Sequence, residues 1–434
     1  MILSCFFLKF ALVSPINFLV MKTISRLLVL VLMLSVKTLL AQEFYSVSGR
    51  VQDASNRKNL SYASIQLLST NISNVSNSDG FFVLKVPKHV TADTILVSYL
   101  GFRSQKIAIT PNSNQEISVK LTPSEINLKP VTIRPQDADL LIKLAISRID
   151  NNYPVEPKQM TAFYREMIKK GSSYVSINEA VLDINKAPYV GYRADQLGIY
   201  KARGNYDENR VDTLMVKFQG GPNSAIEIDV AKDPFLGVDP FSMDNIYRFS
   251  FGTPVTIGDK FFYVIEFNEK EGLADIYFRG KVYIESESMA IARIEFNMNV
   301  EGRENANSYF VKKKPFNLKM DVVSAAYLVN YKEIDGIWYF DYSRTEVKFQ
   351  AKWDKKWFKN NYTVYSELAT TDISDRQRKI DTENRIRPKD IISNRVKDFT
   401  DSNFWGGYNI IEPDESIGSV ISRIVKQLKK RDQE

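Results

Sequence analysis

The chain has 434 residues, of which 44% are apolar and 25% charged, a composition ordinary for globular proteins and unlike that of disordered chains. This length allows two or three domains. The formal net charge is +7, but the first 41 residues hold four basic residues and no acid, which leaves 54 basic against 51 acidic residues elsewhere. A remainder this balanced lacks the basic surface that nucleic-acid binding requires, so we expect no nucleic-acid partner.

Residues 1–41 predict a secretory signal peptide. From Met21 the order is regular: a short basic stretch, an apolar run over 27–36, and Ala41 followed by Gln42. We expect the true start at Met21 and cleavage between Ala41 and Gln42. The alternative is a membrane anchor made of both apolar runs, but each run is shorter than the ~20 residues that a span needs. The mature chain is therefore expected to be exported and to lack a transmembrane span.

Residues 44–134 predict seven short strands. Apolar and polar residues alternate along this stretch, for example at Phe82, Leu84 and Val86, as expected of strands with one buried face. Asp79-Gly80 supplies the positive φ of a tight turn. Short strands at close spacing indicate a β-sandwich.

The same stretch resembles a known envelope domain. The resemblance rests on Ser48–Asp53, Ala63–Leu67, Asn77–Pro87 and Leu96–Phe102. Together they resemble the carboxypeptidase regulatory-like domain of Bacteroidetes envelope proteins, a transthyretin-like sandwich, which implies an accessory role without the zinc peptidase chemistry. The same domain precedes TonB-dependent receptors. The resemblance therefore implies a place in the periplasm or at the outer membrane, associated with uptake machinery.

Residues 135–157 predict a helical linker between two domains. Apolar residues recur there at helical spacing, and Pro154 and Pro157 end the pattern. The stripe comprises Ala138, Leu141, Ile142, Ala145, Ile146 and Ile149.

Residues 158–371 predict an antiparallel β domain. Long alternating runs succeed one another, and Asp335-Gly336 lies between two of them as a strong hairpin signal. Residues 219–254, rich in Gly, Pro and Asp, predict a long loop or small insert. Consecutive long strands indicate one large, curved sheet. The hairpin at 280–296 resembles the half-barrel of LolA/LolB lipoprotein carriers, which implies shelter for an apolar ligand.

Residues 372–434 predict a surface excursion and a C-terminal helix. The aromatic residues of 404–408 are expected to dock the excursion. An apolar stripe over 412–430, with acids at its start and bases at its end, indicates an amphipathic helix. This helix either covers the sheet or contacts a membrane from its surface. The narrow stripe without aromatic residues favours covering the sheet.

Few residues are suited to catalysis. The only cysteine, Cys5, lies in the signal peptide, and His89 is the only histidine. These residues cannot build the usual zinc sites, so no metal or cofactor is expected. Pairs of carboxylates could still serve as the catalytic groups of a hydrolase. Candidates are Glu285 with Glu287, and the acids of the 219–254 segment.

Aromatic and basic residues alternate in Lys352–Lys359. Such a pattern can bind sugars, lipid headgroups or single strands, but it also arises where a hairpin packs one face. Trp338, which precedes Tyr339 and Phe340, could likewise form a ligand platform or pack in the core. The candidate ligand or partner surface comprises Trp338, Trp353, Trp357 and Phe358.

These features favour an exported, non-catalytic binding or accessory protein that shelters an apolar ligand or docks to an outer-membrane protein. Two alternatives are a carboxylate-based hydrolase of envelope polymers and a structural outer-membrane adaptor. An apolar cavity lined by strands would favour the binding protein, and two facing acids in a polar cleft the hydrolase. A filled sheet with one exposed apolar patch would favour the adaptor.

Overall fold

The computed structural model describes residues 44–124, 137–206, 217–218, 221–234, 237–240, 242–313, 316–354, 357–388, 390, 392, 395–396, 404–415 and 417–422. The predicted signal peptide, with Ala41 and Gln42, lies outside the described residues. So does the end of the predicted C-terminal helix, after Ser422. Within the described residues, no helix combines the length and apolar character needed to cross a membrane.

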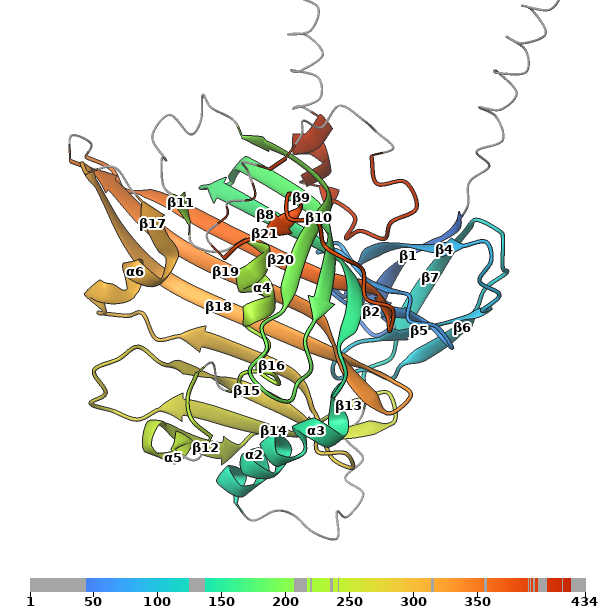
Figure 1. Cartoon of the computed structure of the whole chain (residues 1–434), viewed down its shortest axis with the longest axis horizontal. Coiled ribbons are helices and arrows are strands. Elements are labelled where there is room, and N and C mark those ends of the chain that lie inside the picture. The colour runs from blue at the N-terminus through green and yellow to red at the C-terminus, as the bar shows by residue number, and fades with distance from the viewer. Residues whose placement is uncertain are drawn as a thin grey trace, which may run out of the picture.

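The fold is mainly β, as predicted, and begins with a seven-stranded sandwich (Figure 1). One of its sheets has the order β4-β1-β7 and the other β3-β2-β5-β6. β1 pairs antiparallel with β4 and parallel with β7. The strands are β1 (Phe44–Asp53), β2 (Ser64–Leu67), β3 (Ser73–Val75), β4 (Phe81–Pro87), β5 (Thr94–Ser98), β6 (Gln105–Ala108) and β7 (Gln115–Leu121).

Alternation along the sandwich strands produces its core. Every second residue of β4 is fully buried, and these side chains meet those of β1 and β5 between the sheets. The turn before β4 depends on Gly80, whose φ is +72° and where a Cβ would lie 2.6 Å from the carbonyl oxygen of Val51. Asn77 Oδ1 accepts the N–H groups of Asp79 and Phe81 and fixes this turn.

Two helices connect the sandwich to the large sheet. α2 (Ala138–Ser147) begins at Asp137, whose side chain accepts the N–H of Asp139, and α3 (Ile149–Asn152) follows it. α2 buries Ala138, Leu141, Ile142 and Ala145, all members of the predicted apolar stripe. Both helices lie at the β12–β14 end of the sheet (Figure 1).

The second part of the chain forms a 12-stranded antiparallel sheet that does not close. Its order is β12-β14-β15-β16-β18-β19-β20-β8-β9-β10-β21, with β13 beside β14. The strands are β8 (Lys158–Lys170), β9 (Ser173–Lys186), β10 (Gln196–Tyr206), β12 (Tyr247–Phe251), β13 (Val255–Ile257), β14 (Lys260–Glu269), β15 (Phe278–Glu285), β16 (Ile291–Met298), β18 (Leu318–Ile334), β19 (Ile337–Trp353), β20 (Asn360–Ser374) and β21 (Arg385–Ile386).

The 219–254 segment contains more structure than a loop. It carries α4 (Pro222–Glu227), α5 (Met243–Ile246) and β12, which extends the sheet beyond β14. Further on, η1 (Glu304–Ala306) and α6 (Asn307–Phe310) precede β17 (Val311–Lys313), which pairs with β11 (Lys217–Phe218). Short elements of this kind depend on packing against the sheet, which local sequence does not reveal.

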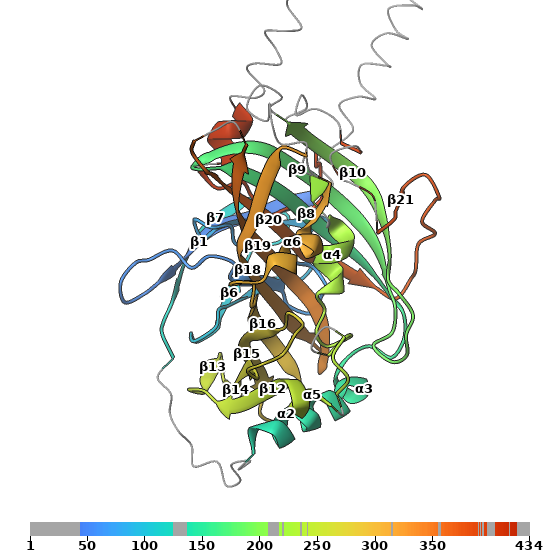
Figure 2. The same cartoon turned by 90° about the vertical axis from the view of Figure 1, so that its left-hand side faces the viewer.

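The two faces of the large sheet are covered differently (Figure 2). On the helix-covered face, a large apolar cluster joins α2 and α4 to the strands, and Tyr164 of β8 belongs to it. On the opposite, sandwich-covered face, Phe163 of β8 packs with Val75 of β3 and with Trp405. Alternation along β8 thus sends neighbouring side chains to different partners.

An interdomain groove as candidate functional site

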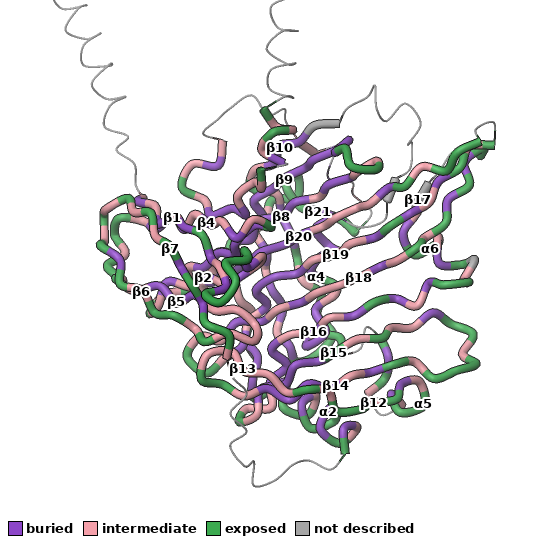
Figure 3. The backbone as a smooth tube through the Cα atoms, turned by 180° about the vertical axis from the view of Figure 1, so that it is seen from behind, coloured by how far each residue is buried: buried purple, intermediate pink, exposed green. Residues whose placement is uncertain are grey.

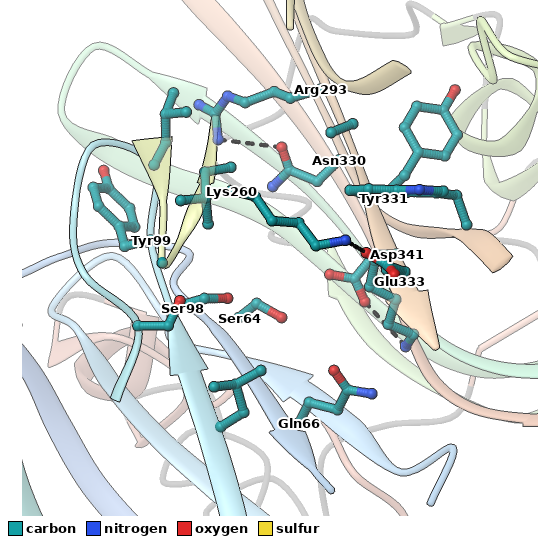
Figure 4. Close-up of a pocket in the computed structure, with 18 of the residues that line it drawn as sticks. Ser64, Gln66, Ser98, Tyr99, Lys260, Arg293, Asn330, Tyr331, Glu333 and Asp341 are labelled. Atoms are coloured by element: carbon teal, nitrogen blue, oxygen red, sulfur yellow. Dashed lines mark hydrogen bonds and ion pairs between the residues drawn. The ribbon is translucent and has the colours of Figure 1, made fainter. Parts of the chain in front are cut away.

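A cavity of about 720 Å³ separates the sandwich from the large sheet. One wall is formed by β2, β5 and β6 of the sandwich, and the other by β13, β14, β16, β18 and β19 (Figure 4). The groove therefore lies between two domains, a frequent place for ligand sites.

One end of the groove is closed by main-chain contacts. The N–H of Gly101 donates to Thr256 O at 3.0 Å, and the N–H of Gly258 donates to Phe102 O at 3.1 Å. These bonds join the loop after β5 to β13. A Cβ at Gly258 would lie 2.8 Å from Ser104 Oγ, so the close approach favours glycine there.

The other end is fixed by side chains. Tyr62 stacks on Tyr342 with ring centroids 5.4 Å apart, and its hydroxyl accepts an Arg344 N–H at 2.8 Å. Nearby, the buried Lys332 ammonium donates to Ser73 of β3 and pairs with Asp341 at 3.0 Å. With both ends held, the two walls are preorganised and a ligand would spend little binding energy on ordering them.

Uncharged polar side chains line the sandwich wall. β2 alternates between the core residues Ile65 and Leu67 and the outward-facing Ser64 and Gln66, and β5 likewise presents Ser98. Within the described part of the chain, no side-chain hydrogen bond is formed by Ser64, Gln66 or Ser98. Figure 4 shows all three beside the open space, where a ligand would find their hydrogen-bonding groups unused.

The charges that line the two walls together are balanced. Lys260 forms an ion pair with Glu333, and Lys332 forms one with Asp341. Arg293 pairs with Glu295 and donates to Asn330 Oδ1 at 3.1 Å. Four bases and four acids line the groove, so its formal charge is zero. The set is Lys106, Lys260, Arg293 and Lys332 with Asp259, Glu333, Asp335 and Asp341.

The groove continues along the sheet. A second hollow of about 270 Å³ shares Arg293 with it and crosses β16, β18 and β19. Arg344 and Glu346 form the far side of that hollow.

Of the four aromatic residues taken as a candidate surface, only Trp338 lies at the groove. Its indole is 5% exposed and packs edge-on against Phe262, with the Lys260 ammonium 5.6 Å from the ring centre. Trp338 is therefore part of the wall rather than an open platform. Trp353 lies at the other end of the same strand, about 50 Å away.

Trp357 and Phe358 lie beyond Trp353, in the turn before β20, with 94% and 84% of their surfaces exposed. The structure thus separates the predicted surface into one groove residue and one distant cluster. Spacing along a 17-residue strand explains the separation, since an extended chain carries its two ends far apart.

Glu285 and Asp229, two of the other candidates for chemistry, have structural partners. Glu285 is buried and accepts the N–H groups of Glu287 and Ser288, so it stabilises the β15–β16 turn. Asp229 accepts the hydroxyl groups of Tyr189 and Tyr331 and pairs with buried Lys186 at 2.8 Å. His89 is exposed in the loop after β4. Among the described residues, no cluster of three or more His, Cys, Asp or Glu side chains is arranged to hold a metal ion.

A buried charge network holds the C-terminal segment beside the groove. Glu179 accepts Arg165 Nε at 2.8 Å and Arg203 Nε at 2.9 Å, and Arg165 Nη2 donates to Ile411 O at 2.7 Å. Burial by itself raises the pKa of the Glu179 carboxyl, but the two guanidinium groups outweigh burial and lower it below its ordinary value. Glu179 therefore stays ionised at neutral pH.

The sequence did not single out the groove residues. Ser64, Gln66 and Ser98 follow the ordinary polar-outside alternation of any strand. Their only distinction is that a second domain faces them, and that contact joins parts of the chain separated by hundreds of residues.

Residues 47–133 match the CarboxypepD_reg-like domain family. The sandwich is a CarboxypepD_reg-like domain. The match confirms the resemblance seen in the sequence and covers about a fifth of the chain. Among curated proteins, none matches the chain.

Two solved structures are similar to part of this chain. A LolA superfamily protein from Nitrosomonas europaea is 12% identical with a TM-score of 0.25, covering 56% of this chain and 96% of that chain. A DUF1329 family protein from Desulfovibrio piger is 14% identical with a TM-score of 0.23, covering 54% and 94%. TM-scores this low say nothing about a ligand.

Proposed function

We propose that the protein is an exported, non-catalytic binding protein of the cell envelope, and that the groove between its CarboxypepD_reg-like domain and its large sheet holds a neutral, hydroxyl-rich ligand such as a saccharide segment. The observation that carries the proposal is the lining of the groove. Unused hydroxyl and amide groups face Lys260 and Lys332, whose charges are paired with Glu333 and Asp341. A ligand with many hydroxyl groups and no net charge matches both properties.

Other ligand classes fit the groove less well. A strongly charged polymer would find no net opposite charge among the eight ionisable groups that line it. An apolar ligand would leave Ser64, Gln66 and Ser98 buried without partners, which costs about 1–3 kcal/mol for each group. The described part of the helix-covered face is a packed apolar cluster, so it also favours a filled sheet over a carrier cavity.

The groove also argues against the hydrolase alternative. Of the four acids that line the groove, Glu333 and Asp341 are each held by a lysine, so neither of these two is poised as a free acid or base. The structural-adaptor alternative keeps one specific observation in its favour, the exposed aromatic cluster at Trp357 and Phe358. Binding in the groove and attachment through that cluster are compatible roles.

A blocked groove tests the proposal. In the Ser98→Trp variant the indole would occupy the space between the walls, so affinity for a bound oligosaccharide should fall about tenfold or more. Ser118, exposed on β7 in the other sheet of the sandwich, gives the matched control Ser118→Trp. The measurement is titration calorimetry with a panel of neutral glucan, mannan and xylan oligosaccharides.

Equal affinity of wild type and Ser98→Trp would contradict the groove as the binding site. Failure of the wild type to bind any member of the panel would contradict the saccharide class. A loss of affinity in Ser118→Trp as large as in Ser98→Trp would show that the effect is not local to the groove.

A further inference from the structure

Three aromatic side chains are exposed together at one end of the large sheet. Phe316 is 102% exposed, Trp357 94% and Phe358 84%. Single exposed apolar residues are ordinary. Three large aromatic residues in adjacent turns form an apolar patch, and its exposure to water is unfavourable. We call Phe316, Trp357 and Phe358 the aromatic tip.

The strands bring these residues together. Leu318, the first residue of β18, pairs with Trp353, the last residue of β19. Beyond that pair, the N–H of Asp354 donates to Asn317 O at 3.1 Å and joins the two turns. Phe316 and Trp357 thus belong to one end of the sheet, although 40 residues separate them. Figure 3 shows this exposed end on the side away from the sandwich.

A packed base supports the tip. An apolar cluster beneath it includes Leu318, Phe349 and Tyr362, and Trp353 packs against this cluster half-buried. The Lys359 ammonium donates to Gln350 Oε1 at 3.2 Å across the hairpin. The aromatic residues therefore lie in turns directly next to paired strands, which keep the two turns at the same end of the sheet.

Lysines surround the aromatic tip. Lys319 of β18, Lys352 of β19 and Lys359, which directly precedes β20, are exposed beside it. In the sequence, 312–319 and 352–359 together contain eight lysines, one aspartate and no arginine. The formal charge of these sixteen residues is +7, equal to that of the whole chain. Without residues 1–41 and these two segments, the chain has a formal charge of −4, so the two segments stand out in the sequence as strongly basic.

We propose that the aromatic tip docks the protein on the surface of an anionic lipid bilayer. Trp and other aromatic rings favour the boundary between water and hydrocarbon, and lysines near the rings attract anionic headgroups by about 1 kcal/mol each. Protein interfaces are depleted in Lys and enriched in Arg, so the all-lysine surroundings favour lipid over a protein partner. The tip lies apart from the groove, and this proposal does not depend on what the groove binds.

Vesicle binding tests the proposal. The full chain is sedimented with vesicles of phosphatidylcholine alone and with vesicles of phosphatidylcholine and phosphatidylglycerol in equal parts. We expect preferential binding to the anionic vesicles, weakening as salt screens the lysines. The triple variant Phe316→Ser, Trp357→Ser, Phe358→Ser should partition about tenfold less, because the apolar insertion is lost. Intact-mass measurement shows whether residues 1–41 have been removed, and only variants with the same N-terminus are compared.

Two further variants keep the test interpretable. Tyr192→Ser removes a fully exposed aromatic residue elsewhere and should bind like the wild type. Lys319→Gln, Lys352→Gln, Lys359→Gln should lose most of the preference for anionic vesicles while circular dichroism stays unchanged. The Trp357 emission should shift to the blue on binding, and the shift should be absent in Trp357→Phe.

The proposal is overturned if wild type binds anionic vesicles no better than neutral ones. It is also overturned if the aromatic triple variant, folded as judged by circular dichroism, partitions like the wild type. A protein partner would then be the remaining explanation for the aromatic tip.

Discussion

Glu179 lies on β9, the third strand from one edge of the large sheet, between two guanidinium groups, and its side chain is fully buried. Buried charges are stable only when they are paired and hydrogen-bonded. Here the carboxylate holds both Arg165 and Arg203, and Arg165 in turn holds the main chain at Ile411. The network thus fixes the C-terminal segment on the face where the sandwich docks.

Replacing Glu179 should therefore destabilise the whole protein. Glu179→Gln leaves two buried guanidinium groups with a neutral partner, and we expect the free energy of unfolding to fall by about 3–5 kcal/mol. The half-buried surface pair of Glu346 with Arg344 provides the control, since Glu346→Gln should cost less than about 1 kcal/mol. Urea unfolding measures both. A cost of Glu179→Gln no larger than that of the control would contradict the role assigned to the network.

The contribution of Glu179 to stability should depend on pH in acidic solution. Because the pKa of Glu179 is lowered on folding from its ordinary value of 4.5, its stabilisation is complete above that value and is lost as pH falls below it. The stability difference between wild type and Glu179→Gln should therefore be constant from pH 7 to about pH 5 and shrink in more acidic solution. A stability difference between the two proteins that grows as pH falls would contradict a lowered pKa of Glu179 in the folded protein.

The hairpin of β18 and β19 links the groove to the aromatic tip. Asp335 and Gly336 form its turn with φ values of 50° and 82°, the two positive angles of a type I′ turn. Both residues line the groove, whereas the opposite end of the same strands carries Trp353. One long hairpin therefore connects the two surfaces to which we assign function.

Gly336→Val should weaken this hairpin. A β-branched residue at positive φ is strained, and we expect a loss of about 1–3 kcal/mol in unfolding free energy. Gly418 provides the contrast, since it lies in the C-terminal helix and a Cβ there meets no atom within 4 Å, so Gly418→Ala should be neutral or slightly stabilising. Thermal unfolding of both variants checks this, and equal melting temperatures would contradict the strain at the turn.

At the scale of the molecule, local signals in the sequence predicted the elements better than their assembly. Alternation at Phe82, Leu84 and Val86 and the Asp335-Gly336 turn are properties of a few neighbouring residues, and the structure bears out the strands and hairpin that they predict. The groove was not predictable in this way, because Ser98 and Lys260 face each other only through domain docking. Trp357 carried a usable local signal, its lysine-rich surroundings, whereas the burial of Trp338 depends on Phe262 from another strand.

The central claim is that the groove, rather than an apolar cavity in the sheet, holds the ligand. Native mass spectrometry of wild type and Ser98→Trp, each purified from the envelope, tests it most directly. The account predicts a polar, saccharide-type adduct on the wild type that is absent from Ser98→Trp and retained by Ser118→Trp. A lipid adduct carried equally by all three proteins would contradict the account, because only an apolar site away from the groove would be indifferent to Ser98.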